Sequence, residues 1–257
     1  MEGSYAEVEG IRWHYVENGE GAPLLFVHGN TGSSAWWKET MDIPGYRVVA
    51  PDLPNFGLSD ALPGEISIEA YAEALAAFIV AMDLGGAVAV GHSLGGSVCL
   101  ALAARHGELL GGLVLVDSSS PKGLVTPESN YPAIEAMRRD RSFLSAALKA
   151  VVPGLRDEGL FALLVDEAMK MAGPAWIGNA RALSRFDVSA DLAAWTKPVL
   201  VLWGGRDALV TEAMARETKE AFRDARLEII AEVGHSVIVE DPVRFKALLQ
   251  DYLARLR

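Results

Sequence analysis

The chain contains 257 residues, of which 51% are hydrophobic and 22% are charged, and its formal net charge is −11 with a pI near 4.9. This length and apolar content suffice to bury the core of one large α/β domain. The acidic balance argues against a nucleic-acid partner, because binding to phosphates requires a basic surface.

The start of the chain and its apolar runs bear on its location. Residues 1–5 lack the basic and apolar regions of a signal peptide, and no uninterrupted apolar stretch approaches membrane-spanning length. Cys99 is the sole cysteine, so no intrachain disulfide can form, which fits a reducing compartment. We therefore expect a cytoplasmic protein without membrane insertion, in which Cys99 is a buried, inert thiol.

The first third of the chain predicts a β-rich start followed by helices. Residues 68–82 place apolar side chains at helical spacing, and Ser67 is a suitable N-cap. The expected elements, in chain order, are paired antiparallel strands over 5–8 and 12–16, a strand over 24–27, a short helix over 35–42, a strand over 46–50 and a helix over 67–82.

A nucleophile motif follows the next strand. Residues 87–90 form an apolar run, and Gly91-His92-Ser93-Leu94-Gly95 follows directly, ahead of a predicted helix over 93–105. Gly-x-Ser-x-Gly in this strand–turn–helix setting presents the serine on a strained turn whose neighbours must be very small. The Ser93 hydroxyl would then stand at a helix N-terminus, where partial positive charge favours an oxyanion.

The later strands end in candidate partners for Ser93. His235, on a loop after the last expected strand, is the candidate base that a serine nucleophile needs. Asp207, in a Gly-Gly-Arg-Asp loop, is the candidate carboxylate that orients this base. Asp117 competes for that role and could instead cap the segment that follows it. The remaining expected elements are strands over 113–116, 199–203 and 227–230, and a closing helix over 245–256.

Jointly, these segments resemble the α/β-hydrolase superfamily, in its branch of small single-domain serine esterases and related hydrolases. They appear in the family's order and rough spacing over nearly the whole chain. The resemblance implies an α/β fold with a mostly parallel eight-stranded sheet, flanking helices on both faces and a helical lid inserted after the sixth strand. The segments that carry it are Val27-His28-Gly29, residues 51–59, residues 91–96, Trp203-Gly204-Gly205-Arg206-Asp207 and Gly234-His235.

The resemblance also implies roles for the site residues. Ser93, Asp207 and His235 follow the family's triad order. The backbone N–H groups of Asn30, in the glycine-rich loop after residues 24–27, and of Leu94 would form the oxyanion hole. We expect His28 to brace this loop by hydrogen bonds. The side chain of Asn30 either binds a substrate oxygen or only holds the loop, and the sequence leaves both open.

The strand alternation stops between residue 117 and about residue 189, where helical patterns take over. We therefore assign residues 1–117 and 190–257 to an α/β-hydrolase core and residues 118–189 to a helical lid. Apolar stripes in such a segment usually pack against the core. Some of them can instead line an acyl-sized pocket, for which the candidates are Trp176, Phe143 and Met137.

These features predict an enzyme that cleaves small-to-medium carboxylic esters through an acyl-enzyme. No cofactor and no metal are expected, because the histidines lack ligand spacing and residues 91–96 do not form Gly-x-Gly-x-x-Gly. Two alternatives use the same fold. One is a carbon–carbon bond (β-diketone) hydrolase or a lactonase with the same triad, and the other is a low-turnover ligand receptor. The oligomeric state is unknown from the sequence.

Overall fold

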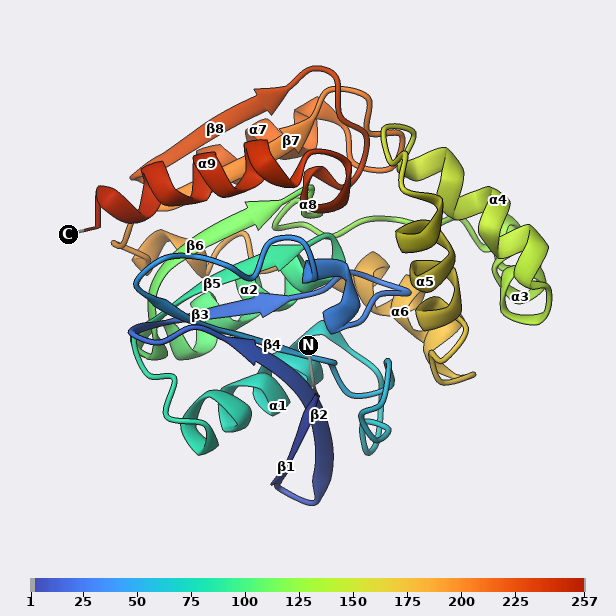
Figure 1. The fold of residues 1–257 in the computed structure, drawn as a ribbon, viewed down its shortest axis with the longest axis horizontal. Helices are drawn as coiled ribbons and strands as arrows, with labels where there is room; N and C mark the ends of the chain where they lie inside the picture. Colours follow the sequence, from blue (N-terminus) through green and yellow to red (C-terminus); the bar gives the residue numbers. More distant parts are fainter. Residues whose placement is uncertain (1–2, 257) are drawn as a thin grey trace.

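The computed structural model describes residues 3–256 and contains one eight-stranded sheet in the order β1-β2-β4-β3-β5-β6-β7-β8 (Figure 1). β1 and β2 are antiparallel, as are β2 and β4, whereas all other neighbouring strands are parallel. The mostly parallel eight-stranded sheet predicted from the sequence is confirmed. The strands are β1 (Ser4–Val8), β2 (Ile11–Asn18), β3 (Ala22–Val27), β4 (Tyr46–Pro51), β5 (Ala87–His92), β6 (Leu110–Val116), β7 (Val199–Gly204) and β8 (Ala225–Ile230).

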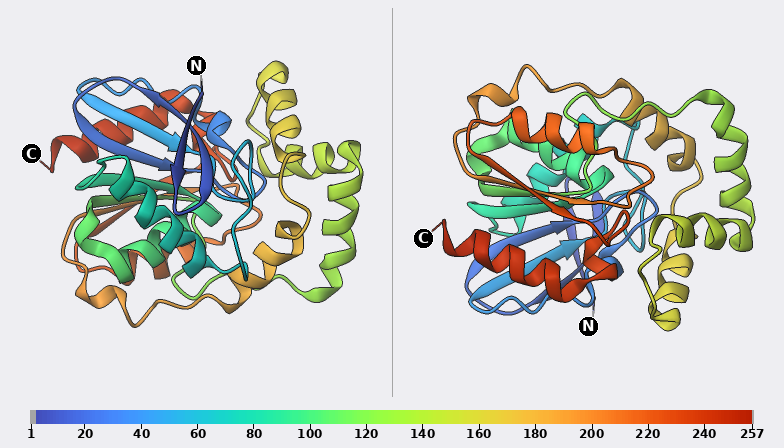
Figure 2. Two further views of the ribbon diagram at one scale, coloured as in Figure 1. Left: turned by 90° about the horizontal axis from the view of Figure 1, so that it is seen from below. Right: turned by 90° about the horizontal axis from the view of Figure 1, so that it is seen from above.

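Helices cover both faces of the sheet, as a parallel sheet requires. Figure 2 shows α9 on one face and α1, α2 and α7 on the other. Within residues 3–256, no helix is long and apolar enough to cross a membrane. The α-helices are α1 (Ile68–Ala81), α2 (Leu94–His106), α3 (Tyr131–Arg139), α4 (Arg141–Val151), α5 (Glu158–Ala168), α6 (Ala175–Arg185), α7 (Glu212–Glu220), α8 (Val237–Glu240) and α9 (Pro242–Ala254), and the 3-10 helices are η1 (Ser34–Trp37), η2 (Gly107–Leu109), η3 (Glu128–Asn130) and η4 (Leu192–Ala194).

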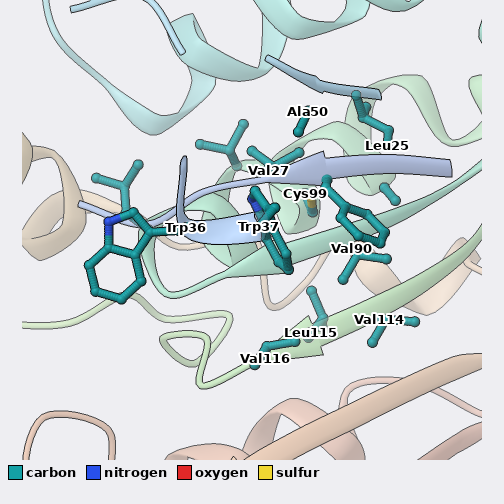
Figure 3. Close-up of a cluster of buried hydrophobic side chains, with 14 of the residues drawn as sticks. Leu25, Val27, Trp36, Trp37, Ala50, Val90, Cys99, Val114, Leu115 and Val116 are labelled. Atoms are coloured by element: carbon teal, nitrogen blue, oxygen red, sulfur yellow. The ribbon is translucent and has the colours of Figure 1, made fainter. Parts of the chain in front are cut away.

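The central strands are buried on both faces, which explains their continuous apolar sequences. Val27, Val90 and Val116 come from the neighbouring strands β3, β5 and β6, and none of them is accessible to solvent. Figure 3 shows these residues on their strands, with Val27 beside Trp37 of η1. The Trp37 ring packs on Phe26 with ring centroids 4.7 Å apart. This packed centre gives fixed positions to the carboxyl ends of β3, β5 and β6, where loops begin.

Local structure agrees with the sequence in one case and departs from it in another. The helix predicted over 67–82 is α1, and Ser67 caps it by accepting a hydrogen bond from the N–H of Ala70 at 3.0 Å. The helix predicted over 35–42 extends only over the 3-10 turn η1. Residues 38–40 continue as turns, and residues 41–43 have no regular secondary structure.

The helices α3 to α6 interrupt the alternation of strands and helices. They lie between β6 and β7 in the sequence and gather at one end of the sheet, on the right in Figure 1. This end is where the loops after the parallel strands emerge. The helical patterns expected between residues 118 and 189 therefore correspond to the helices α3 to α6, which lie beside these loops.

Candidate active site

Ser93 occupies a sharp turn between β5 and α2. Its backbone adopts φ 53° and ψ −120°, in a region that strains a residue with a side chain. A Cβ atom at Gly95 would collide with the carbonyl oxygen of Val27, so this position requires glycine. The N–H of Ser93 donates to the carbonyl of Val116 at 2.9 Å and fixes the turn to β6. The hydroxyl consequently stands at the N-terminus of α2.

Three side chains from separate loops form a continuous chain of hydrogen bonds. Nε2 of His235 lies 2.9 Å from Oγ of Ser93, and Nδ1 of His235 lies 2.7 Å from Oδ2 of Asp207. The second oxygen of Asp207 accepts hydrogen bonds from the N–H groups of Leu209 at 2.7 Å and Val210 at 3.0 Å. Because the carboxylate accepts from Nδ1–H, Nε2 is left to accept the serine proton. This geometry is able to activate a hydroxyl nucleophile.

The surroundings of His235 favour its protonated form. Burial opposes that form, but the hydrogen bond and the negative charge of Asp207 outweigh burial and raise the pKa of His235 above its ordinary value. The charges of Asp117 and Glu240 act in the same direction as Asp207. An imidazolium formed at His235 is therefore stabilised.

Asp117, the competitor for the acid role, lies outside this chain of hydrogen bonds. Its Oδ1 accepts a hydrogen bond from the N–H of Gly204 at 2.8 Å, whereas its Oδ2 is buried without a partner among residues 3–256. Burial raises the pKa of Asp117 to about 8, although the charge of His235 acts against this rise. Asp117 thus joins the ends of β6 and β7, and the carboxylate that bonds to His235 is that of Asp207.

Glu240 holds the loop that carries His235. Its Oε2 accepts a hydrogen bond from the N–H of Gly234 at 3.1 Å, and its Oε1 accepts one from Ser236 at 3.1 Å. The carboxylate thereby binds the backbone on both sides of His235. Oε2 also accepts from the N–H of Gly154 at 2.7 Å, which ties this loop to the chain after α4. Burial raises the pKa of Glu240.

His92, the residue before Ser93, is buried beside the same loop. Its Nε2 lies 2.9 Å from the carbonyl oxygen of His235 and 2.8 Å from Oγ of Ser236, and its ring stacks on Trp36 with centroids 5.6 Å apart. Burial lowers the pKa of His92 to about 3, so the ring is neutral near pH 7. His92 and Ser93 thus point to different parts of the His235 loop.

Sequence reasoning did not identify the contacts of Glu240 or His92. The available signal for Glu240 was a single charged residue that closes the apolar run over 237–239. For His92 it was only its place beside Ser93 in the chain. Neither signal identifies the hydrogen-bond partner, because both side chains bond to backbone groups, which every residue in any sequence provides.

The loop after β3 is braced as predicted. Nδ1 of His28 lies 2.8 Å from the carbonyl oxygen of Gly29, and Nε2 of His28 accepts a hydrogen bond from the N–H of Leu53 at 2.9 Å. Asn30 comes directly after this anchored pair. Leu94 opens α2, so its N–H has no acceptor in a preceding helical turn. Both residues named for the oxyanion hole therefore lie on fixed backbone, Asn30 on the loop after β3 and Leu94 directly after Ser93.

A cavity of about 240 Å³ lies against Ser93 and His235. It is lined by residues at the carboxyl ends of β3, β5, β7 and β8, by Trp36 of η1, and by side chains of α3 and α4. On α4, the lining residues recur at intervals of three and four, as one face of a helix requires. The full lining is Asn30, Thr31, Trp36, His92, Ser93, Met137, Leu144, Ala147, Leu148, Val151, Leu209 and His235.

The three residues predicted to line a pocket have different positions. Met137 lines this cavity. Phe143 does not: it is 44% exposed, because its position on α4 is turned away from the face formed by Leu144 and Ala147. Trp176 does not line it either. It is buried at the start of α6, and its indole N–H donates to the carbonyl of Met171 at 3.3 Å, so it packs one part of the helical segment on another.

The structure also bears on metal binding and on the reactivity of Cys99. Residues 3–256 contain no group of three or more His, Cys, Asp or Glu side chains able to hold a metal ion. Cys99 is buried on α2, and burial raises the pKa of its thiol. A buried thiol of this kind is a poor nucleophile.

Comparison with known proteins identifies a matching family and several similar proteins. A model of a family described as "Alpha/beta hydrolase family" matches residues 24–248. The dihydrolipoyllysine-residue acetyltransferase component of the acetoin cleaving system of Cupriavidus necator is 30% identical, over 97% of this chain and 68% of that protein. The 2-hydroxymuconate semialdehyde hydrolase of Pseudomonas sp. is 26% identical, over 95% of this chain and 91% of that protein. The structure of a thermophilic esterase from Thermogutta terrifontis superposes with a TM-score of 0.80 and 26% identity, over 100% of this chain and 99% of that one.

Proposed function

The chain belongs to the alpha/beta hydrolase family, and from that premise we propose that it is a serine hydrolase that cleaves small-to-medium carboxylic esters. The observation that carries the proposal is the unbroken series of hydrogen bonds from Asp207 through His235 to Ser93, at the wall of a mostly apolar cavity. The likeness to a solved esterase at 26% identity supports the same class of reaction.

The proposed reaction has two acyl-transfer steps. Oγ of Ser93 attacks the ester carbonyl carbon while Nε2 of His235 takes the hydroxyl proton, and Asp207 stabilises the imidazolium. The N–H groups of Asn30 and Leu94 stabilise the oxyanion. The intermediate then expels the alcohol, which receives the proton from His235. A water molecule, deprotonated by His235, attacks the acyl-enzyme and releases the carboxylic acid.

We assign the helical segment over 118–189 the role of a lid, and its inner face the role of a substrate pocket. Met137, Leu144 and Leu148 line the cavity beside Ser93. A cavity of about 240 Å³ suits a short or medium acyl or alcohol group. Its apolar side chains would exclude water from the reacting atoms, which strengthens the electrostatic stabilisation of the oxyanion.

A carbon–carbon bond hydrolase is the second candidate, and one finding favours it. The relative from Pseudomonas sp. that matches over most of both chains is named a 2-hydroxymuconate semialdehyde hydrolase. The same serine, base and oxyanion donors could serve a ketone as well as an ester. Rates on p-nitrophenyl esters, compared with rates on a ring-cleavage diketone, distinguish the two candidates.

The test of the proposed function is chemical labelling of the wild-type enzyme together with Ser93→Ala. A fluorophosphonate should label Ser93, and p-nitrophenyl butyrate hydrolysis should fall by about 10⁴-fold or more in Ser93→Ala, by analogy with other triads. The substitution removes one oxygen, so the melting temperature should change little. A label on another residue, or more than a tenth of wild-type activity in the variant, would remove Ser93 from the role of nucleophile.

A further inference from the structure

A buried polar relay reaches the candidate active site from the far side of Asn30. Asn55, on the loop after β4, donates from Nδ2 to the Tyr71 hydroxyl on α1 at 2.9 Å. The Tyr71 hydroxyl donates to Oδ1 of Asn179 on α6 at 2.9 Å. Nδ2 of Asn179 then donates to Oδ1 of Asn30 at 2.9 Å. Asn55, Tyr71 and Asn179 are 5%, 0% and 0% exposed, so water does not compete for the bonds among these three residues, whereas the bond to Asn30 is partly buried.

The donor and acceptor order of this relay is fixed at Asn55, its end farthest from Asn30. Oδ1 of Asn55 accepts a hydrogen bond from the backbone N–H of Leu62 at 3.1 Å, so only the NH₂ of Asn55 is left to face Tyr71. Since the hydroxyl of Tyr71 receives that donor, its own proton must go to Asn179. Reversing Asn179 would place two donors on Tyr71 and leave its proton without an acceptor, which is costly in a buried network.

The relay therefore orients Asn30 at the cavity wall. Its Oδ1 is held by Asn179, and its Nδ2 has no acceptor among residues 3–256, while Asn30 itself lines the cavity beside Ser93. The group that faces the cavity is consequently an NH₂ donor and not a carbonyl acceptor. A donor with no protein partner is matched by an acceptor on the ligand.

We propose that Tyr71 and Asn179 are positioning residues that hold Asn30 as a substrate-binding donor, and that the preferred esters carry a second oxygen acceptor within a few atoms of the scissile carbonyl. The proposal rests on the proposed esterase function and narrows its substrate class. Such substrates include ether, keto or lactone-ring oxygens near the ester. The remaining cavity wall is largely apolar, so this acceptor would have few other partners there.

The test compares pairs of esters that differ by one oxygen in place of a methylene. The pairs are p-nitrophenyl methoxyacetate with butyrate, p-nitrophenyl 3-methoxypropanoate with pentanoate, and 2-methoxyethyl acetate with butyl acetate. The ratio of kcat/KM within each pair is measured in the wild type, Tyr71→Phe, Asn179→Asp and Asn30→Ala. The intrinsic reactivity of each ester cancels when the variants are compared with the wild type. Tyr252→Phe, which removes another buried hydroxyl far from Ser93, is the control.

We expect the ether-to-alkyl ratio of at least one pair to fall about five- to tenfold in Tyr71→Phe and Asn30→Ala, the effect of one hydrogen bond. Asn179→Asp should lower it further, because a carboxylate accepts from Tyr71 and from Asn30 and so turns the Asn30 oxygen to the cavity. Tyr252→Phe should leave every ratio unchanged. Simple loss of stability would lower both rates of a pair together and leave the ratio constant.

Ratios within twofold of wild type for all three pairs in both Tyr71→Phe and Asn30→Ala would overturn the proposal and reduce the relay to packing. These two variants keep the test valid if Asn179→Asp does not fold. A wild-type enzyme that hydrolyses none of the six esters would instead overturn the proposed function, so the two failures are distinct.

Discussion

Nε2 of His92 lies 2.9 Å from the carbonyl oxygen of His235, so the residue before the candidate nucleophile holds the backbone of the candidate base. His92 is buried and neutral, and a carbonyl can only accept, so Nε2 must carry the ring proton. Oγ of Ser236, at 2.8 Å, is the second group on that nitrogen. The positions of nucleophile and base are therefore coupled through one imidazole as well as through their direct hydrogen bond.

His92→Phe should weaken catalysis and stability together. The phenyl ring preserves the stack on Trp36 but leaves the buried carbonyl of His235 without a donor, at a cost of about 1–3 kcal/mol in unfolding free energy. A less fixed His235 should lower kcat by roughly tenfold with a smaller change in KM. Urea denaturation and steady-state kinetics on p-nitrophenyl butyrate measure both effects. Wild-type kcat in the variant would mean that Asp207 alone orients the base.

Asp207→Asn should cut kcat by roughly 10³–10⁴-fold. The Asn amide can donate a hydrogen bond to Nδ1 of His235, which places the ring proton on Nε2. A protonated Nε2 cannot accept the proton of Ser93. The reduction is measured on p-nitrophenyl butyrate at saturating concentration.

Asp117→Asn is the matched control for that substitution, because Asp117 also ends a central strand close to His235. It should keep kcat within about tenfold of wild type, since its bond is to the N–H of Gly204 and not to the base. A larger loss in Asp117→Asn than in Asp207→Asn would assign the acid role to the end of β6.

The fold and the three aligned side chains could be predicted because their signals are local. Ser93 lies in a turn that only small neighbours allow, and Asp207 and His235 follow the strands β7 and β8, whose parallel pairing brings their ends together. The chemistry of each residue type then limits what such a cluster does. No knowledge of distant contacts is needed for this step.

The pocket and the relay depend on contacts that the sequence does not encode locally. Phe143 and Leu144 are adjacent apolar residues on different sides of α4. Phe143 is exposed to solvent, whereas Leu144 lines the cavity. Asn179 appears as one polar residue within a helix, and its partner Asn30 lies 149 positions away. α7 was not predicted because only Ala215 and Thr218 of its residues are buried, which leaves little apolar periodicity.

Asp117 should make stability depend on pH. Its pKa of about 8 in the folded protein exceeds the value near 3.9 of a free Asp side chain. A raised pKa means that the folded state binds the proton more tightly, so this group's favourable contribution is complete below about pH 4 and is lost as pH rises toward 8.

The side chain of Asn does not titrate, so Asp117→Asn removes this pH dependence. The stability of Asp117→Asn relative to wild type should therefore increase between pH 5 and pH 8, by up to about 3 kcal/mol. Urea denaturation at both pH values measures the difference. An equal difference at pH 5 and pH 8 would show that Asp117 is ionised in the folded protein.

Ala147→Leu should shorten the range of acyl chains that the enzyme accepts. Ala147 lines the cavity on α4, and a leucine there would occupy part of the volume of about 240 Å³. kcat/KM for p-nitrophenyl hexanoate and octanoate should fall about tenfold relative to acetate, because one or two methylene contacts are worth about that factor. Phe143→Ala is the control on the same helix: its side chain is 44% exposed and turned away from the cavity, so the chain-length profile should stay that of wild type. A profile that changes in Phe143→Ala and not in Ala147→Leu would place the acyl group on the outer side of α4 and remove this cavity from the role of substrate pocket.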